Sequence, residues 1–156
     1  MKPEIKDREV RTFNLDEKSF ETREDGTRRI VGHAAVFNQW SEDLGGFREQ
    51  IAPGAFAEAI NADDVRALFN HDTNQVLGRN VSKTLTLLEE PRGLLSEIIL
   101  PDTQLARDLE VLMKRGDINQ MSFAFSIGKD GQEWKRVGEG PWERTITKVS
   151  RLYDVS

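Results

Sequence analysis

The sequence contains no cysteine, and this absence removes several kinds of chemistry. Without cysteine there is no disulfide, no thiolate nucleophile and no Cys-ligated metal, and the composition suits a reducing compartment. Histidine is scarce too, because the 156 residues include only His33 and His71. Any reaction that uses an imidazole must therefore rely on one of these two side chains.

Long apolar runs and basic clusters are also missing. No stretch approaches the roughly 18 apolar residues of a membrane-spanning helix, and the N-terminus lacks the hydrophobic region of a secretory signal. The net charge is −5, with lysine and arginine scattered among acids. A phosphate-binding surface normally needs a basic patch, so we expect neither nucleic acid nor a membrane as a partner.

Short segments rich in alternating or β-branched apolar residues dominate the chain. They are residues 9–15, 29–37, 64–70, 83–88, 94–100, 121–127, 133–137, 143–149 and 152–155. A short helix is predicted from Pro53, and a longer one is predicted to be capped by Asp102 and to stop at Gly116. Residues 38–50 and the polar residues after His71 are predicted to be loops. The pattern predicts an α+β protein, with a mostly antiparallel β-barrel or strongly bent sheet and a few helices packed outside.

The length predicts one domain. Residues 1–8 are mostly charged or polar, and we expect a flexible N-terminus there. Residues 9–156 are expected to form a single domain. The chain ends at Ser156 inside an apparent strand, so we expect this end to be truncated or processed.

The stretch "GDINQMSFAFSI", residues 116–127, alternates large apolar residues with the small residues Ser122, Ala124 and Ser126. The large residues are typical of a core face, and a small hydroxylated face is usually a surface for close packing. No GxSxG elbow surrounds either serine. By period alone Ser122 and Ser126 are interchangeable, and the pattern predicts at most a Ser–His pair.

Each histidine lies in or next to a predicted strand. His71 follows "ALFN", shares that strand's apolar face by period 2, and borders a polar loop, where a side chain is both held and reachable. His33 is mid-strand and is interpreted as a core or barrel-wall histidine bonded to the backbone. A metal site from both would need a carboxylate, and no HxH or HExxH spacing supports it. The acids Asp72, Glu97 and Asp154 are best interpreted as solvated.

Seven short motifs occur in order along the chain. They are "GHAAVFN", "EQIAPGAF", "ALFNHD", "VLGR", "GLLSEIILPDT", "RGDINQMSFAF" and "ITKVSRLYDVS". Each motif alone is weak, but the ordered set is specific and covers nearly the whole length. Together the motifs resemble the prohead (capsid maturation) protease family of tailed phages. That family is similar in fold to the herpesvirus assemblins, serine proteases with a β-barrel wrapped by helices, so the resemblance implies an assemblin-like fold.

The resemblance also implies a Ser–His pair, with the serine in "MSF" and the histidine in "NHD". Here those residues are Ser122 and His71. In assemblins the third member is a second histidine downstream of the serine, and this chain has no histidine after position 71. If a third member exists it must be an acid. Asp154 is the best-placed candidate in chain order, and Glu143 and Asp72 remain open.

The function implied by the resemblance is that of a serine endopeptidase without a cofactor or metal. Its substrates would be the major capsid protein or its scaffolding segment, and the protease itself. It would act inside the immature prohead in the bacterial host cytoplasm, as a homodimer or higher homo-oligomer, because assemblins need dimerisation. The alternatives are a non-catalytic phage assembly or scaffold module of the same fold and, more remotely, a metal-dependent hydrolase.

Overall fold

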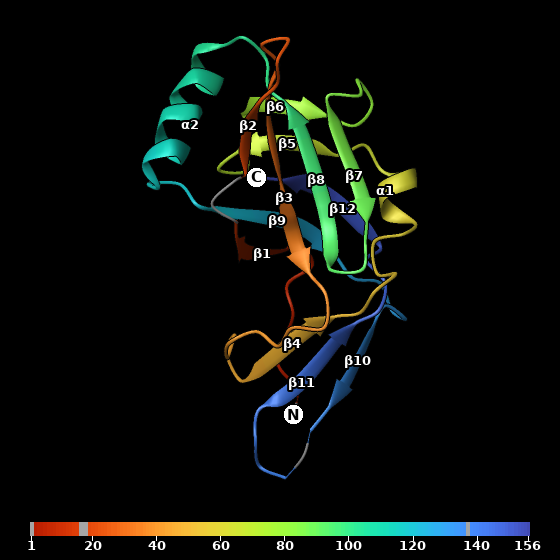
Figure 1. Cartoon of the computed structure of the whole chain (residues 1–156). Coiled ribbons are helices and arrows are strands. Elements are labelled where there is room, and N and C mark those ends of the chain that lie inside the picture. The colour runs from red at the N-terminus through yellow and green to blue at the C-terminus, as the bar shows by residue number, and fades with distance from the viewer. Residues whose placement is uncertain (1, 16–18, 137) are drawn as a thin grey trace.

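The computed structural model describes residues 2–15, 19–136 and 138–156, and strands dominate these residues (Figure 1). The elements in chain order are β1 (Glu9–Asn14), β2 (Phe20–Thr22), β3 (Arg28–Val36), β4 (Phe47–Ile51), α1 (Ala59–Ala62), β5 (Arg66–Phe69), β6 (Asp72–Arg79), β7 (Leu85–Glu89), β8 (Gly93–Ile99), α2 (Gln104–Arg115), β9 (Gln120–Ser126), β10 (Gln132–Lys135), β11 (Trp142–Ile146) and β12 (Arg151–Val155). They form a five-stranded sheet in the order β1-β9-β12-β5-β6, a four-stranded sheet β2-β3-β8-β7 and a three-stranded sheet β10-β11-β4. Figure 1 shows the three-stranded sheet at the end of the molecule away from α2.

The predicted class, mostly strands with few helices, is confirmed. Of the two predicted arrangements, the β-barrel is wrong, and the strongly bent sheet stays a prediction. Within the described residues all three sheets are open. On the edge strand β6, Asn74 is exposed and Gln75 is half-buried. The outer side of this strand therefore suits water rather than another strand. Most pairings are antiparallel as predicted, whereas β11–β4 and β12–β5 are parallel. The likeness to assemblins stays a prediction.

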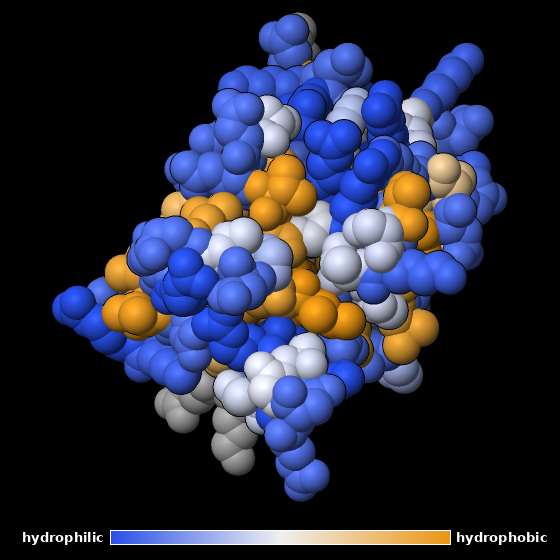
Figure 2. Space-filling view, turned by 90° about the horizontal axis from the view of Figure 1, so that it is seen from above, coloured by the Kyte–Doolittle hydropathy of each residue, from blue (hydrophilic) through white to orange (hydrophobic). Residues whose placement is uncertain are grey.

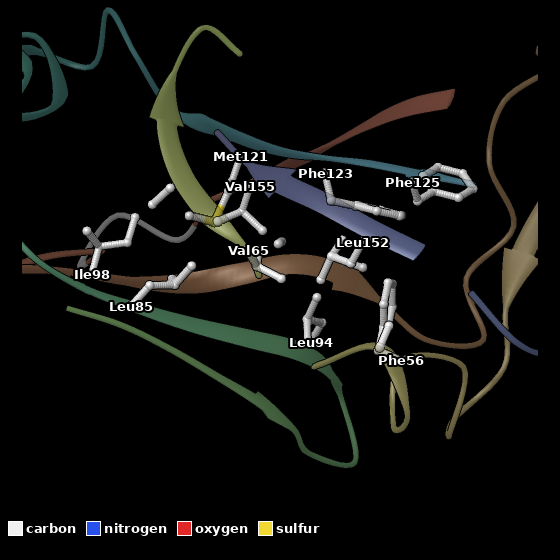
Figure 3. Packing of buried hydrophobic residues seen from close by; sticks show 14 of the residues in the cluster. Phe56, Val65, Leu85, Leu94, Ile98, Met121, Phe123, Phe125, Leu152 and Val155 are labelled. Carbon is white, nitrogen blue, oxygen red and sulfur yellow. The ribbon is translucent and has the colours of Figure 1, made fainter. Parts of the chain in front are cut away.

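The main core lies between the five-stranded and four-stranded sheets. Figure 3 shows Met121, Phe123 and Val155 on the first sheet facing Leu94 and Ile98 on the second. These side chains are buried. The apolar alternation predicted for residues 121–127 therefore contributes to this core, where the rings of Phe123 and Phe125 lie tilted against one another with centroids 4.7 Å apart.

Two strands lie where the sequence predicts loops. β4 occupies the end of the 38–50 stretch, and its buried positions Phe47, Glu49 and Ile51 alternate as in any strand. The acid at the middle position obscures that pattern in the sequence. β6 occupies the polar stretch after His71, where few apolar side chains are needed because it pairs with β5 alone. β4 depends on its pairing with the distant strand β11, and β6 depends on its pairing with the preceding strand β5, rather than on local apolar periodicity.

The helices differ from prediction mainly at their starts. The helix predicted from Pro53 is only α1, because the chain before it is occupied by turns. α2 is capped by Thr103, whose Oγ1 accepts the Ala106 N–H at 3.2 Å, and not by Asp102. Its predicted end is confirmed, because Gly116 adopts the left-handed φ of 84° that glycine tolerates without strain.

A buried charge cluster joins β1 to the three-stranded sheet. Arg144 is fully buried, and its guanidinium bonds both carboxylate oxygens of Glu9, at 2.7 and 2.9 Å, and Glu49 at 3.2 Å. Arg11 bonds the same two carboxylates from the other side, and Gln132 accepts from Arg144 Nε at 2.7 Å. Two cations thus neutralise two anions, and every buried side-chain polar atom in the described residues has a partner. The cluster holds β1 in place beside β9.

Candidate functional site

His71 lies in the hairpin turn between β5 and β6, not in the strand. Asn70 and His71 connect the strands, with φ of 54° and 55°. Two consecutive left-handed residues are typical of a type I′ hairpin turn, which favours Asn followed by Gly. The period-2 placement of His71 on the apolar face of β5 is therefore wrong, because the chain reverses direction before that residue. The turn instead presents the imidazole at the end of the sheet.

Ser122 lies on β9, near the centre of the five-stranded sheet. Its neighbours Met121 and Phe123 point into the core, so Ser122 faces the opposite side and is 8% exposed. Its backbone N–H donates to the Ser156 carbonyl at 3.0 Å, and the Ser156 N–H returns a bond to the Ser122 carbonyl at 2.9 Å. Both backbone hydrogen-bonding groups of the serine are therefore held by the residue after β12, while Thr12 on β1 lies opposite the serine across the other edge of β9.

The structure brings the predicted site residues Ser122, His71 and Asp154 together. His71 Nε2 lies 2.5 Å from Ser122 Oγ, and His71 Nδ1 contacts Asp154 Oδ1. Asp154 lies on β12 and is 2% exposed. A carboxylate on Nδ1 holds the proton there and leaves the Nε2 lone pair free to accept the serine proton. The arrangement can therefore move a proton from a hydroxyl to an imidazole.

Two further residues support these three and carry no signal in the sequence. Arg8 Nη2 donates to the second carboxylate oxygen of Asp154 at 3.0 Å, and its guanidinium lies 4.1 Å from the centre of the Tyr153 ring. Ser156 Oγ accepts the backbone N–H of His71 at 2.8 Å. Arg8 belongs to the segment predicted to be flexible, and flexibility of residues 1–8 stays a prediction.

The other candidates of the sequence lie elsewhere. Asp72 accepts the backbone N–H of Asn74 at 2.9 Å, and Glu143 accepts from Arg48 Nε at 2.9 Å. Ser126 Oγ bonds the hydroxyl of Tyr153 at 2.8 Å. Of the three acids considered as the third member, Asp154 is the one placed against His71.

His33 is not among the residues that contact Ser122, His71 or Asp154 in the described part of the chain. It lies on β3 in the four-stranded sheet. Its Nε2 contacts the Glu90 carboxylate, whereas the sequence predicts a hydrogen bond to the backbone. Among residues 2–15, 19–136 and 138–156, no three His, Cys, Asp or Glu side chains are grouped to hold a metal ion.

A cavity of about 490 Å³ opens beside Ser122 and His71. Ser156, Thr12 and Gln120 also line it at this polar end. Apolar side chains from β3, β5, β6, β8 and α2 line most of the rest, together with polar side chains from the β5–β6 turn and from the segment between α2 and β9. Figure 2 shows apolar surface within a hollow on the face seen from above, surrounded by hydrophilic residues. In the part of the chain that the structure describes, no helix is long and apolar enough to cross a membrane.

Comparisons with known proteins agree with the resemblance of the motifs. The family model for the caudovirus prohead serine protease matches residues 13–156. The prohead protease of Enterobacteria phage HK97 is 34% identical over 132 residues, or 82% of this chain, which spans about half (54%) of that relative's length. The solved structure of the bacteriophage T4 capsid assembly protease has a similar fold, with a TM-score of 0.58 and 11% identity, covering 95% of this chain and 96% of that one. The family model covers most of the sequence, and the chain therefore belongs to the caudovirus prohead serine protease family.

Proposed function

We propose that this chain is the protease domain of a capsid maturation serine endopeptidase. In this proposal Ser122 is the nucleophile, His71 is the general base, and Asp154 orients and stabilises His71. The observation that carries the proposal is the unbroken series of contacts from Asp154 through both ring nitrogens of His71 to Ser122 Oγ. Membership in a family of prohead serine proteases supports it.

The reaction follows from the direction of these hydrogen bonds. His71 Nε2 takes the Ser122 proton as Oγ attacks the carbonyl carbon of a peptide bond. The imidazolium then donates that proton to the departing amine nitrogen, which leaves an ester on Ser122. A water molecule, deprotonated by His71 in turn, hydrolyses the ester and restores the serine hydroxyl. Throughout, the buried carboxylate of Asp154 stabilises the charged imidazolium.

The local fold keeps these groups in position. The left-handed hairpin turn holds the imidazole, and the two backbone hydrogen bonds between Ser122 and Ser156 hold the nucleophile. Such strained and over-determined backbone is typical of functional sites. Preorganisation of this kind lowers the barrier because little has to move when the bond is broken.

The biological setting is proposed from the relatives. The relative from phage HK97 is a prohead protease, and the T4 structure is that of a capsid assembly protease. We infer that the substrates here are the major capsid protein or its scaffolding segment, and the protease itself. The protein would act inside the prohead in the host cytoplasm, as a homodimer or higher homo-oligomer and without a cofactor.

The test is cleavage of the cognate capsid protein by matched serine variants. Ser122→Ala and His71→Ala should each lower the cleavage rate by at least about 10⁴-fold, and Asp154→Asn by about 10⁴-fold. Ser126→Ala is the control, because Ser126 lies on the same strand and bonds Tyr153 instead. Its cleavage rate should stay close to that of the unmodified protein. Undiminished cleavage by Ser122→Ala would refute the assignment.

A second measurement separates an enzyme from a non-catalytic assembly module. A fluorophosphonate should phosphonylate Ser122, with loss of fluoride, in the concentrated protein and in Ser126→Ala but not in His71→Ala. Peptide mass mapping identifies the modified residue. A concentrated, folded protein that stays unlabelled at Ser122 would favour the assembly module.

A further inference from the structure

The cavity beside Ser122 has two unlike ends. At one end are the polar groups of the proposed reaction. Away from them the walls are mostly aliphatic and come from both large sheets and from α2. The principal residues of this apolar part are Ile30, Leu68, Leu77, Ile98, Leu109 and Met113.

A void of this size is unusual for a packed interior. Protein cores leave few spaces larger than a water molecule, whereas ligand pockets span roughly 300–1,000 Å³ and are mostly apolar with a few polar groups. The cavity here, about 490 Å³, falls in the second class. Ser122 itself lines it, so the cavity and the proposed nucleophile share one continuous space.

The charges around the cavity narrow the choice of occupant. Among the described residues that line it, no lysine, arginine or glutamate is present. Its one aspartate, Asp117, is already 3.2 Å from Arg115. A charged side chain entering the apolar part would lose its hydration without gaining an ionic partner, which is costly.

We propose that this cavity is the specificity pocket for a large apolar side chain of the polypeptide substrate, such as leucine, isoleucine, methionine or phenylalanine. The residue that carries it lies within a few positions of the cleaved bond. This inference rests on the proposed function, since it assumes that Ser122 attacks a peptide. Binding of that side chain holds the scissile carbonyl at the polar end, against Ser122 and His71.

The helix α2 offers a matched pair of positions for the test. Met113 is partly buried and lines the cavity, whereas Val111, two residues earlier, is 55% exposed on the other side of the helix. Met113→Trp should narrow the cavity, and Met113→Ala should widen it. Val111→Trp adds the same bulk to the same helix without entering the cavity.

The experiment is cleavage of a random peptide library by the full chain, with mass spectrometry of the products. One fixed position near the cut should carry large apolar residues. Replacing leucine there by alanine should lower kcat/KM about 50-fold, because three buried carbon groups are lost. A library cut with no such preference would overturn the inference.

The variants then show whether the cavity is responsible. Met113→Trp should lower kcat/KM at least about ten-fold for the leucine peptide and leave that for the alanine peptide nearly unchanged. Met113→Ala should shift the preference towards phenylalanine and tryptophan, and Val111→Trp should change neither. Unaltered preference in both Met113 variants would place the specificity elsewhere and refute the pocket.

Failure of the two proposals can be told apart by fluorophosphonate labelling of the same samples. If the unmodified protein is not labelled at Ser122 and cuts no peptide, the proposed function fails. If Ser122 is labelled in every variant but no apolar preference exists, only the pocket fails.

Discussion

The left-handed backbone of His71 leads to a prediction in which glycine is better than alanine. At a φ of 55° an L-residue with a Cβ is strained by about 1–2 kcal/mol, and glycine is not. Glycine in turn costs about 0.5–1 kcal/mol through the entropy of the unfolded chain. His71→Gly and His71→Ala lose the same contacts to Ser122 and Asp154, so these losses cancel in the comparison. His71→Gly should therefore be more stable than His71→Ala by about 1 kcal/mol.

Thermal and urea denaturation of both variants provide the assay. For a chain of this length the difference corresponds to a Tm higher by roughly 2–4 °C for His71→Gly. The same pair of substitutions at Asn74 is the control, because Asn74 is exposed on strand β6 and has no left-handed φ. There alanine should be at least as stable as glycine. If alanine is also better at position 71, His71 does not occupy a left-handed turn, and the geometry inferred for the site is wrong.

Three further predictions concern charged side chains, one beside the site and two elsewhere in the fold. Arg8→Ala removes a hydrogen bond to the buried Asp154, so kcat/KM should fall about five-fold with little change in Tm. Arg8→Lys should restore part of the lost kcat/KM. An unchanged kcat/KM in Arg8→Ala would exclude a positioning role for Arg8. Arg144→Ala leaves the buried carboxylates of Glu9 and Glu49 short of a partner, so the free energy of unfolding measured in urea should fall by about 3–5 kcal/mol. A loss below about 1 kcal/mol would contradict the view that Arg144 neutralises these carboxylates. The hydrogen bond from Lys114 lowers the pKa of Glu110 below its usual value near 4.5. Ionised Glu110 therefore stabilises the folded state at a pH above 4.5, and this stabilisation is lost as the pH falls through the lowered pKa. The stability advantage of the unmodified protein over Glu110→Gln in urea should therefore be greatest near neutral pH and shrink in acid, and a constant advantage would show that this carboxylate is not involved.

The parts of the fold that the sequence predicts well are those governed by local patterns. The alternation around Phe123 predicts a core strand, and Gly116 predicts the end of α2, because both signals act over a few residues. The turn at Gly26, which joins β2 and β3, follows an aspartate, and Asp-Gly is a turn signal of the same local kind. By contrast, β4 pairs in parallel with β11 over a separation of nearly a hundred residues, and no local pattern reports such a partner.

The site shows the same division. His71 and Ser122 are found from motif order, and chain order ranks Asp154 first among three open acids. Arg8 and Ser156 are missed because their roles consist of contacts between segments about 85 to 146 residues apart. An arginine in a charged N-terminal segment and a serine after a strand are ordinary residues until the fold places them.

The position of Asp154 depends on an irregularity in β12 that strict alternation would not predict. Leu152 pairs with Phe125 on the core face of β9, so in a regular ladder Asp154 would pair with Phe123 and also point into the core. The register shifts between Leu152 and Asp154, and Asp154 instead pairs with Ala124. Residues opposite one another in a ladder share a face, and Ala124 shares its face with Ser122, two positions away. The extra residue in β12 thus turns the carboxylate from the core to the side of the sheet that carries the serine, where the β5–β6 turn brings the imidazole between them. A bulge that re-aims one side chain in this way is a known feature of β-sheets beside functional sites.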